Sequence, residues 1–196
     1  MSETAIAEPH PLRTFLKGMT QLLDSAGGEE ARLLRDGGLL LQRLVSDDNW
    51  LPDYCAEPGA RSYQQYLLYC DPLERFSVVS FVWGPGQGTP IHNHTVWGLV
   101  GILRGAETER RYTRVDGVLR PGEVSRLTPG MVASVSPNDH DIHQVANALA
   151  DRVSISIHVY GGNIGTIRRS TFDAATGAER TFISGYGNSV LPNVWT

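Results

Sequence analysis

The stretch GQGTPIHNHTVWGLVGILRG, residues 86–105, holds two histidines that are separated by a single residue and set among glycines. In a β-strand, residues i and i+2 project from the same face, about 7 Å apart at a rise of about 3.3 Å per residue. His92 and His94 could therefore converge on one atom. Imidazole is a ligand for iron, zinc, copper and nickel, so this pair provides half of a candidate metal site.

Short segments rich in β-branched and aromatic residues surround these histidines from Tyr63 onward. Gly, Pro, Asn and Asp separate the segments at close intervals, a pattern typical of antiparallel sandwiches and barrels. We therefore expect a mainly β fold. The strand-like segments are FSVVSFVWG (76–84), TVWGLVGILRG (95–105), AETERRYTRVDG (106–117) and RVSISIHVYGG (152–162).

The first fifty residues carry the apolar spacing of helices instead. Apolar side chains recur at i, i+3, i+4 and i+7 over residues 12–23, and the glycines at 27 and 28 end that segment. A second apolar pattern over residues 31–45 is interrupted by Gly37 and Gly38, so we expect a short helix, a break and another helix. We expect one domain over residues 1–196, with a helical cap at 1–50 and a β-barrel at 60–196.

Composition excludes several classes of protein. The chain has 17 Lys and Arg against 21 Asp and Glu, without a basic cluster, so we expect no nucleic-acid partner. No stretch approaches the roughly 20 apolar residues of a membrane helix, and we expect a soluble, cytoplasmic protein without a membrane partner. Cys55 and Cys70 are too few for a disulfide framework and are expected to be free thiols.

The glycines and histidines of the opening stretch resemble the first motif of the cupin superfamily, G-x5-H-x-H-x3-E-x6-G. Gly86, His92, His94 and Gly105 match this motif. Gly98 departs from it, because most cupins place a metal-binding Glu there. The resemblance implies a jelly-roll-like cupin β-barrel, preceded here by the N-terminal helical cap.

A second cupin motif resembles the stretch SPNDHDIHQVAN, residues 136–147, with Pro137, His143 and Asn147 at the expected relative places. This resemblance implies that His143 is the third metal ligand. His140 lies three residues earlier and is the alternative, but the motif fits His143.

A cupin with three histidines and no Glu resembles the thiol dioxygenases of the cysteine dioxygenase type, and the resemblance runs from about Tyr63 to Arg169. That family binds non-haem Fe(II) and needs no organic cofactor. The resemblance implies Fe(II) at His92, His94 and His143, with a small thiol and O2 as the reaction partners. Both oxygen atoms would end on sulfur and give a sulfinic acid.

A polar row in SISIHVY, residues 154–160, adds to this resemblance. Period-two geometry places Ser156, His158 and Tyr160 on one face of a strand and three aliphatic residues on the other. The family has such a row beside its metal. The resemblance implies that Tyr160 donates a hydrogen bond to a ligand of the metal, while His158 and Ser156 fix its hydroxyl.

One family feature is missing. Animal cysteine dioxygenases carry a Cys after the first motif that is cross-linked to the active-site tyrosine, and this sequence has Gly98 there if one gap is allowed. We therefore expect Tyr160 to be free of a cross-link, which resembles the bacterial relatives.

The stretch RSYQQYLLY, residues 61–69, is used to predict the substrate. Mammalian-like cysteine dioxygenases have an arginine in this strand, whereas bacterial relatives with glutamine resemble 3-mercaptopropionate dioxygenases. If this strand is aligned with the family by its distance to the first metal ligand, Gln64 takes the place of the arginine; if it is aligned by the preceding tyrosine, Gln65 does. Neighbouring residues of a strand point to opposite faces, so only one of the two can point inward, and we choose Gln64. A guanidinium for the substrate carboxylate could come from Arg168 or Arg169, and the sequence leaves that choice open.

The predicted function is therefore an Fe(II)-dependent thiol dioxygenase acting on a small carboxylated thiol, 3-mercaptopropionate ahead of L-cysteine, with cysteamine least favoured. One rival is a non-catalytic metal- or small-molecule-binding cupin, which would have no need of the polar row. Another is a cupin enzyme with a different substrate, which would normally keep the Glu that Gly98 replaces. The N-terminal helices either cap the barrel or mediate a homo-oligomer.

Overall fold

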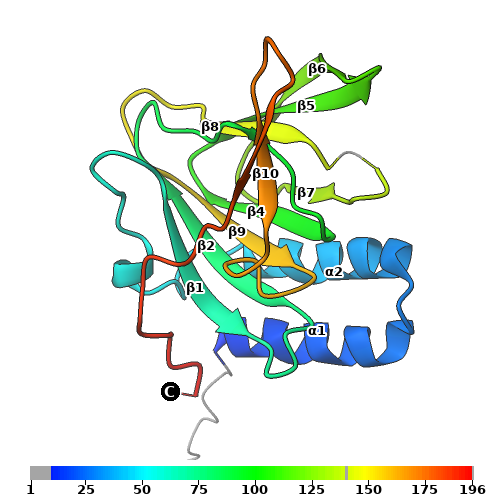
Figure 1. Cartoon of the computed structure of the whole chain (residues 1–196). Helices are drawn as coiled ribbons and strands as arrows, with labels where there is room; N and C mark the ends of the chain where they lie inside the picture. Colours follow the sequence, from blue (N-terminus) through cyan, green and yellow to red (C-terminus); the bar gives the residue numbers. More distant parts are fainter. Residues whose placement is uncertain (1–9, 140, 196) are drawn as a thin grey trace, which may run out of the picture.

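Two helices open the part of the chain that the computed structural model describes, residues 10–139 and 141–195. α1 (Pro11–Ala26) and α2 (Glu30–Leu44) run side by side beneath the strands (Figure 1). Gly27, at φ 58° in the left-handed region, ends α1 where the sequence predicted. No helix in the described ranges has both the length and the apolar character needed to cross a membrane.

Helix α2 is continuous, so the predicted break at Gly37 and Gly38 is wrong. A glycine inside a helix costs about 1 kcal/mol relative to alanine, and burial of the apolar face of α2 offsets this cost. Gly37 is buried, and a Cβ there would lie 3.1 Å from Leu99 Cδ1. The glycine thus permits close approach between the helix and β4 (Gly98–Arg104) instead of ending the helix.

Within the described residues, the strands form two antiparallel sheets that face each other (Figure 1). One sheet has the order β1-β2-β9-β4-β7 and the other β11-β10-β3-β8-β5-β6. This arrangement confirms the predicted mainly β, jelly-roll-like cupin fold with helices at its N-terminal end. The strands are β1 (Gln64–Cys70), β2 (Ser77–Trp83), β3 (Ile91–His92), β4, β5 (Glu107–Val115), β6 (Val118–Leu127), β7 (Val132–Val135), β8 (His143–Asn147), β9 (Ser154–Tyr160), β10 (Arg169–Phe172) and β11 (Glu179–Phe182), and a short 3-10 helix, η1, spans Asp53–Cys55.

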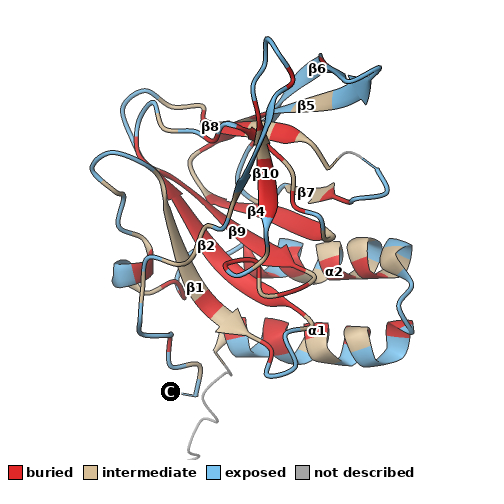
Figure 2. Ribbon diagram, in the orientation of Figure 1, coloured by how far each residue is buried: buried red, intermediate tan, exposed pale blue. Residues whose placement is uncertain are grey.

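Two of the three inner strands of the five-stranded sheet, β2 and β9, are buried along their whole length (Figure 2). One face of β9 presents Ile155, Ile157 and Val159 to an apolar core shared with both helices. The other face points between the sheets, where Tyr160 packs with Val145 of β8. The predicted alternation of aliphatic and polar residues along β9 therefore separates a core face from an interior face.

The segment after β11 covers the outer edge of β1. Asn188 Oδ1 accepts a hydrogen bond from the Leu67 amide at 2.7 Å, and Asn188 Nδ2 donates to the Leu67 carbonyl at 2.9 Å. The Gly187 amide donates to the Gln65 carbonyl at 2.7 Å. These bonds pair backbone groups that an edge strand would otherwise expose.

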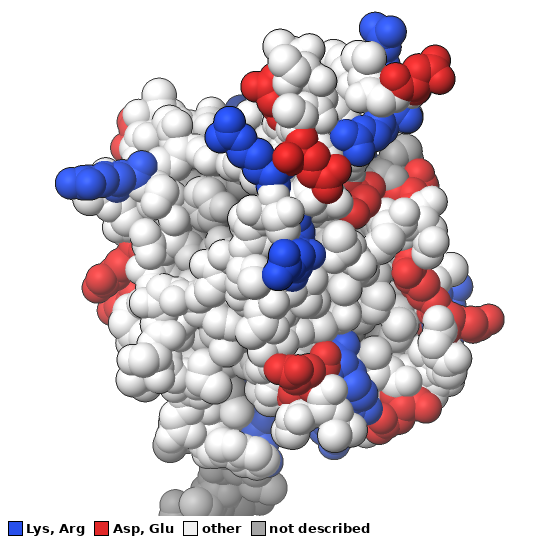
Figure 3. All heavy atoms as spheres, viewed as in Figure 1, with Lys and Arg blue, Asp and Glu red and all other residues white. Residues whose placement is uncertain are grey.

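Charged side chains are dispersed over the surface. Figure 3 shows acidic and basic groups interspersed on the face seen in Figure 1, without a large area of one sign. The two cysteines are free, with Cys55 buried and Cys70 half-buried. Burial raises the pKa of the Cys55 thiol to about 11, so this thiol is neutral and belongs to the core.

Candidate metal centre and its surroundings

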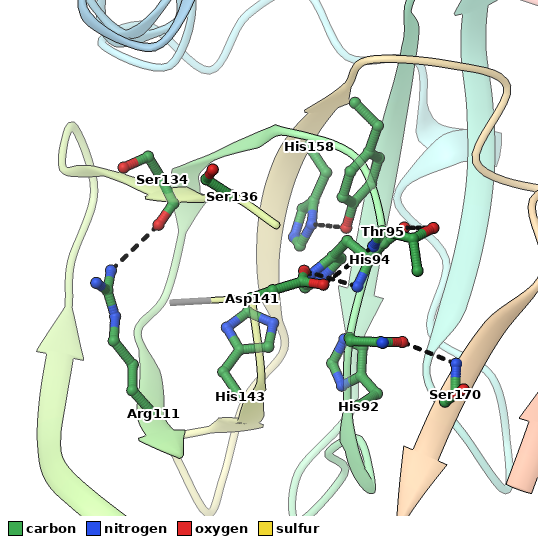
Figure 4. A network of polar contacts seen from close by, with 12 residues as sticks. His92, His94, Thr95, Arg111, Ser134, Ser136, Asp141, His143, His158 and Ser170 are labelled. Carbon is green, nitrogen blue, oxygen red and sulfur yellow. Dashed lines mark hydrogen bonds and ion pairs between the residues drawn. The ribbon is translucent and has the colours of Figure 1, made fainter. Parts of the chain in front are cut away.

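Three buried histidines meet between the two sheets (Figure 4). His92 lies on β3, directly opposite His143 at the start of β8, and His94 follows two residues after His92. Their candidate ligand atoms all lie within 4.8 Å of one another, and among the described residues they form the one such group of His, Cys, Asp and Glu side chains. We call these three residues the histidine cluster. The alternative His140 lies outside the described residues.

Each ring of the cluster has a hydrogen-bond partner at Nδ1. His143 Nδ1 lies 2.7 Å from Glu109 Oε1, His94 Nδ1 lies 3.1 Å from Asp141 Oδ1, and His92 Nδ1 lies 3.1 Å from the Pro90 carbonyl. We assign the proton to Nδ1 in all three rings because each partner is an acceptor. This tautomer leaves the Nε2 lone pairs free, which is the arrangement found in histidines that bind metals.

The electrostatics of the cluster fit a cation. Burial, followed by repulsion from the neighbouring rings, lowers the pKa of His92 and His94 well below the ordinary value, so both imidazoles are neutral. His94 Nε2 is buried without a hydrogen-bond partner. Neutral imidazoles with unpaired, converging nitrogens suit a divalent transition metal, so the residues present fit such an ion.

Asp141 and Glu109 hold two of the rings in place, although the sequence analysis did not identify either residue. Asp141 also accepts hydrogen bonds from the backbone amides of His94 and Thr95, at 2.8 and 3.1 Å. Thr95 has a φ of 62°, an unusual value for a β-branched residue, and the Asp141 carboxylate holds the turn at this point. Burial alone would raise the pKa of Glu109, but its contacts with His143 and Arg111 outweigh burial and leave it lowered.

The polar row of β9, Ser156, His158 and Tyr160, forms a continuous chain of hydrogen bonds. His158 Nε2 lies 2.8 Å from Ser156 Oγ, and His158 Nδ1 lies 2.8 Å from Tyr160 Oη. The Tyr160 ring stacks on His94 at 5.5 Å between centroids, so the chain ends beside the histidine cluster. Burial lowers the pKa of His158 and raises that of Tyr160, so both groups are neutral.

Gly98 faces Tyr160 across the β4–β9 pair. A Cβ built at Gly98 would lie 2.9 Å from Tyr160 Cδ1, so the absence of a side chain leaves room for the tyrosine ring. No sulfur stands at this position. A Tyr160 free of a cross-link stays a prediction.

The two candidate arginines differ in environment. Arg169 is 4% exposed, donates from Nη2 to Ser184 Oγ at 2.6 Å and stacks on Phe182 at 4.6 Å. Its Nε is buried without a partner, whereas Arg168 is exposed on the surface. The positive charge of Arg169 also acts to lower the pKa of Tyr160 and of His94 in the cluster. Arg169 is therefore the arginine that the fold places beside the site.

The register of β1 reverses the expected orientation of the glutamines. Gln65 pairs with Phe81, which stacks on His158 at 3.9 Å, whereas Gln64 pairs with Val82 of the core face. Gln65 Oε1 is buried without a partner, and Gln64 Nε2 donates to the nearby Ser62 carbonyl at 3.4 Å. Gln65 therefore shares the interior face and Gln64 lies on the opposite face of β1, although both side chains line the cavity described next. Which of the two binds substrate stays a prediction.

A cavity of about 400 Å³ opens beside these residues. Its lining includes Gln65 as well as Phe182 and Ser184, the two residues that contact Arg169. No acidic side chain is among the lining residues, which are Ser62, Tyr63, Gln64, Gln65, Phe182, Ser184, Gly185, Tyr186 and Gly187. The cavity thus presents neutral polar groups and aromatic rings next to one buried guanidinium.

One signal in the sequence could have identified the acidic partners. Glu107 and Glu109 alternate in AETERRY, so period two places both carboxyls on one face of a predicted strand. Both are buried in the structure. Asp141 gave no comparable signal, because its role depends on a turn that approaches it from a distant segment.

Comparisons with known proteins found similar sequences and similar structures. The model of the family Cysteine dioxygenase type I matches residues 71–174. Cysteine dioxygenase type 1 of Danio rerio is 24% identical over 202 residues, covering 95% of this chain and 93% of that protein. Two solved structures align with lower similarity. An uncharacterized protein with a double-stranded β-helix domain from Klebsiella pneumoniae has a TM-score of 0.47 at 15% identity, with 71% of this chain and 93% of that chain covered. A cupin superfamily protein from Desulfitobacterium hafniense has a TM-score of 0.43 at 18% identity, with 60% and 94% covered.

Proposed function

The chain belongs to the cysteine dioxygenase type I family, and from this premise we propose that it is a thiol dioxygenase. Its substrate in this proposal is a small carboxylated thiol, 3-mercaptopropionate ahead of L-cysteine, and its product is the sulfinic acid. The thiol R–SH and one O2 combine to R–SO2H, so the atoms balance. Sulfur provides the four electrons that reduce O2, and no further reductant is needed.

The proposed cofactor is Fe(II), held by Nε2 of His92, His94 and His143. Bound Fe(II) would offer open coordination positions to a thiolate and to dioxygen and so bring the two reactants together. The protein contributes the orientation of the three rings through the partners at Nδ1. It also contributes the burial that keeps the site apart from bulk water.

The observation that carries the proposal is the neutral Tyr160 hydroxyl beside the histidine cluster, at the end of its own hydrogen-bond chain. A tyrosine whose pKa is raised by burial keeps its proton, so it can donate a hydrogen bond to a reactant at the cluster. His158 fixes the position of this hydroxyl at 2.8 Å. A metal-binding protein without turnover would have no use for such a donor.

The charges around the cavity support the proposed substrate class. Arg169 has a buried Nε without a partner and is the group that would bind a carboxylate, because guanidinium and carboxylate form paired hydrogen bonds. The cavity lining contains no Asp or Glu, so the ammonium group of L-cysteine would have no counter-charge there. This favours 3-mercaptopropionate, which has a carboxylate and no amine. Gln65 is proposed to lie along the bound thiol in place of Gln64.

Oxygen uptake by the anaerobically Fe(II)-loaded protein tests the proposal. We expect 3-mercaptopropionate to give the highest kcat/KM, L-cysteine a lower value and cysteamine the lowest. Higher kcat/KM with L-cysteine would overturn the substrate and leave the reaction class in place. No thiol-dependent uptake by protein with bound iron would reject the dioxygenase and favour a non-catalytic metal-binding cupin.

A further inference from the structure

Glu107, at the start of β5, is a buried carboxyl that the proposed mechanism does not use. It is 0% exposed, and its Oε1 lies 3.0 Å from Ser154 Oγ, which lies at the same distance from the Arg104 carbonyl. Its Oε2 is buried without a partner. None of the ion pairs found among the described residues involves this carboxyl. A buried carboxylate without a cation is unfavourable, so this position favours the neutral acid.

The carboxyl lies at the far end of the polar row. Ser154 precedes Ser156 by two residues and shares its face on β9. Three neutral groups act on Glu107, namely Ser156 and Ser154 from β9 and the Trp83 indole from β2. Trp83 Nε1 also donates to Ser156 Oγ at 3.2 Å. Hydrogen bonds thus link Ser156, His158 and Tyr160 in a row, and Glu107 lies beside Ser156 at one end of this row.

The hydrogen bonds of this row can run in either of two directions, because a neutral imidazole has one donor and one acceptor. In the first direction, His158 Nδ1–H donates to Tyr160 Oη and Nε2 accepts from the Ser156 hydroxyl. The Tyr160 proton is then free to point toward the histidine cluster. In the second direction, Tyr160 donates to Nδ1 and Nε2–H donates to Ser156, so the Tyr160 proton points away from the cluster.

We infer that Glu107 is a positioning residue that sets the first direction, by donating from a protonated Oε2 toward Ser156 Oγ. The inference rests on the proposed function. Ser156 then accepts from Glu107 and Trp83 and gives its own proton to His158. An ionised Glu107 would instead attract the Ser156 proton and reverse the chain. Burial raises the pKa of Glu107 to about 8, although Ser156, Ser154 and Trp83 oppose this, so the acid form prevails at neutral pH.

The tautomer of His158 reports the direction without any turnover. Protein containing ¹⁵N-histidine and loaded with diamagnetic Zn(II) would be studied by long-range ¹H–¹⁵N correlation, with His158 assigned through His158→Gln. At neutral pH we expect His158 to be protonated at Nδ1. In alkaline solution we expect the proton to move to Nε2 as Glu107 ionises, while the raised pKa of Tyr160 keeps that hydroxyl neutral.

Glu107→Gln is the decisive variant, because an amide donates to Ser156 as the acid does but does not ionise. We expect His158 to keep its Nδ1 proton in this variant at every pH. Glu123→Gln, at an exposed position on β6, is the matched control and should show the wild-type change. An Nε2 proton at neutral pH, or an identical pH response in the wild type and Glu107→Gln, would overturn the inference. If Glu107→Gln does not fold, an Nε2 proton on His158 of the wild type at neutral pH still overturns the inference.

Oxygen uptake provides a second, separable readout. Because Glu107 acts through Ser156 and His158 and does not touch the thiol, we expect Glu107→Leu to lower kcat by about tenfold with KM unchanged. Glu107→Gln should keep the wild-type kcat and lose its decline in alkaline solution. A raised KM in Glu107→Leu would contradict positioning through Ser156. If the wild type shows no thiol-dependent uptake, the proposed function fails, and the tautomer experiment still decides the role of Glu107.

Discussion

Asp141 orders the metal centre through contacts with both ring and backbone. It accepts hydrogen bonds from the amides of His94 and Thr95 and lies 3.1 Å from His94 Nδ1. We expect Asp141→Ala to weaken Zn(II) or Fe(II) binding by about 10- to 100-fold, because the ring loses its orientation. Competition with a chelating dye measures the affinity. Asp116→Asn is the control, because asparagine tolerates the Asp116 φ of 50°. Equal metal affinities of the two variants would show that Asp141 does not order the metal centre.

Arg169 and Arg168 are adjacent in sequence and differ in burial, which makes them a matched pair. We expect Arg169→Gln to raise KM for 3-mercaptopropionate by about 100-fold, because a buried charge pair with the carboxylate is lost. Arg168→Gln should leave KM unchanged. Steady-state oxygen uptake gives both values. The opposite result, with KM raised only in Arg168→Gln, would place the carboxylate elsewhere.

The raised pKa of Glu107 has a consequence for stability. The folded protein keeps the proton up to a pKa of about 8, against an ordinary value of 4.5. Between these values the folded state binds more protons than the unfolded state, so this group's contribution to stability falls as pH rises, with a limiting slope of about 1.4 kcal/mol per pH unit. We expect the free energy of unfolding of Glu107→Gln, measured in urea, to rise relative to that of the wild type from pH 5 to pH 8. A constant difference across that range would show that Glu107 has an ordinary pKa.

Residue-level prediction from the sequence succeeded where local geometry decides. The alternation along β9 is a property of a single strand and is observed. His92 and His94 do meet in one cluster, but β3 ends at His92 and His94 lies in the turn that follows, so the expected strand geometry is not what brings them together. The orientation of Gln64 and Gln65 could not be predicted in this way, because it depends on the pairing of β1 with β2. One step of register turns every side chain to the other face, and nothing within residues 61–69 specifies it.

The packing of α2 on β4 gives a prediction at the next level. A Cβ at Gly101 would lie 2.9 Å from Leu41 Cγ, whereas the nearest atom to one at Gly38 is 3.9 Å away. We expect Gly101→Ala to destabilise the protein by about 1–3 kcal/mol through overpacking. Gly38→Ala should stabilise it by up to about 1 kcal/mol through helix propensity. Urea unfolding measures both, and equal destabilisation by the two variants would contradict the described packing.

The helix break predicted at Gly37 and Gly38 is wrong because of the same packing between α2 and β4. Local propensity treats Gly37 as an interruption, but its neighbours in space are Leu99 of β4 and Met19 of α1. A missing side chain there is a packing feature between elements. The ends of α1 and the strand character of the later segments were predictable, since caps and period-two patterns are local. The contacts that make a mid-helix glycine useful come from distant parts of the chain.

The whole molecule assembles the candidate site from segments far apart in sequence. β3, β8, β5 and β9 each contribute one part, and their neighbourhood is set by the order of strands in the two sheets. The family resemblance implied the three histidines and the polar row. It did not indicate Glu107, Glu109 or Asp141, because their roles arise only when separate strands meet. The proposed chemistry depends on this assembly as a unit.

The central claim is that both atoms of one dioxygen molecule are transferred to the sulfur of a carboxylated thiol. The most direct test is a single reaction of Fe(II)-loaded protein with 3-mercaptopropionate under ¹⁸O2, with the product analysed by mass spectrometry. We predict a sulfinate in which both sulfinate oxygens carry the label, formed in a one-to-one ratio to the oxygen consumed. A product with one labelled oxygen or none, or a disulfide as the sole product, would contradict it.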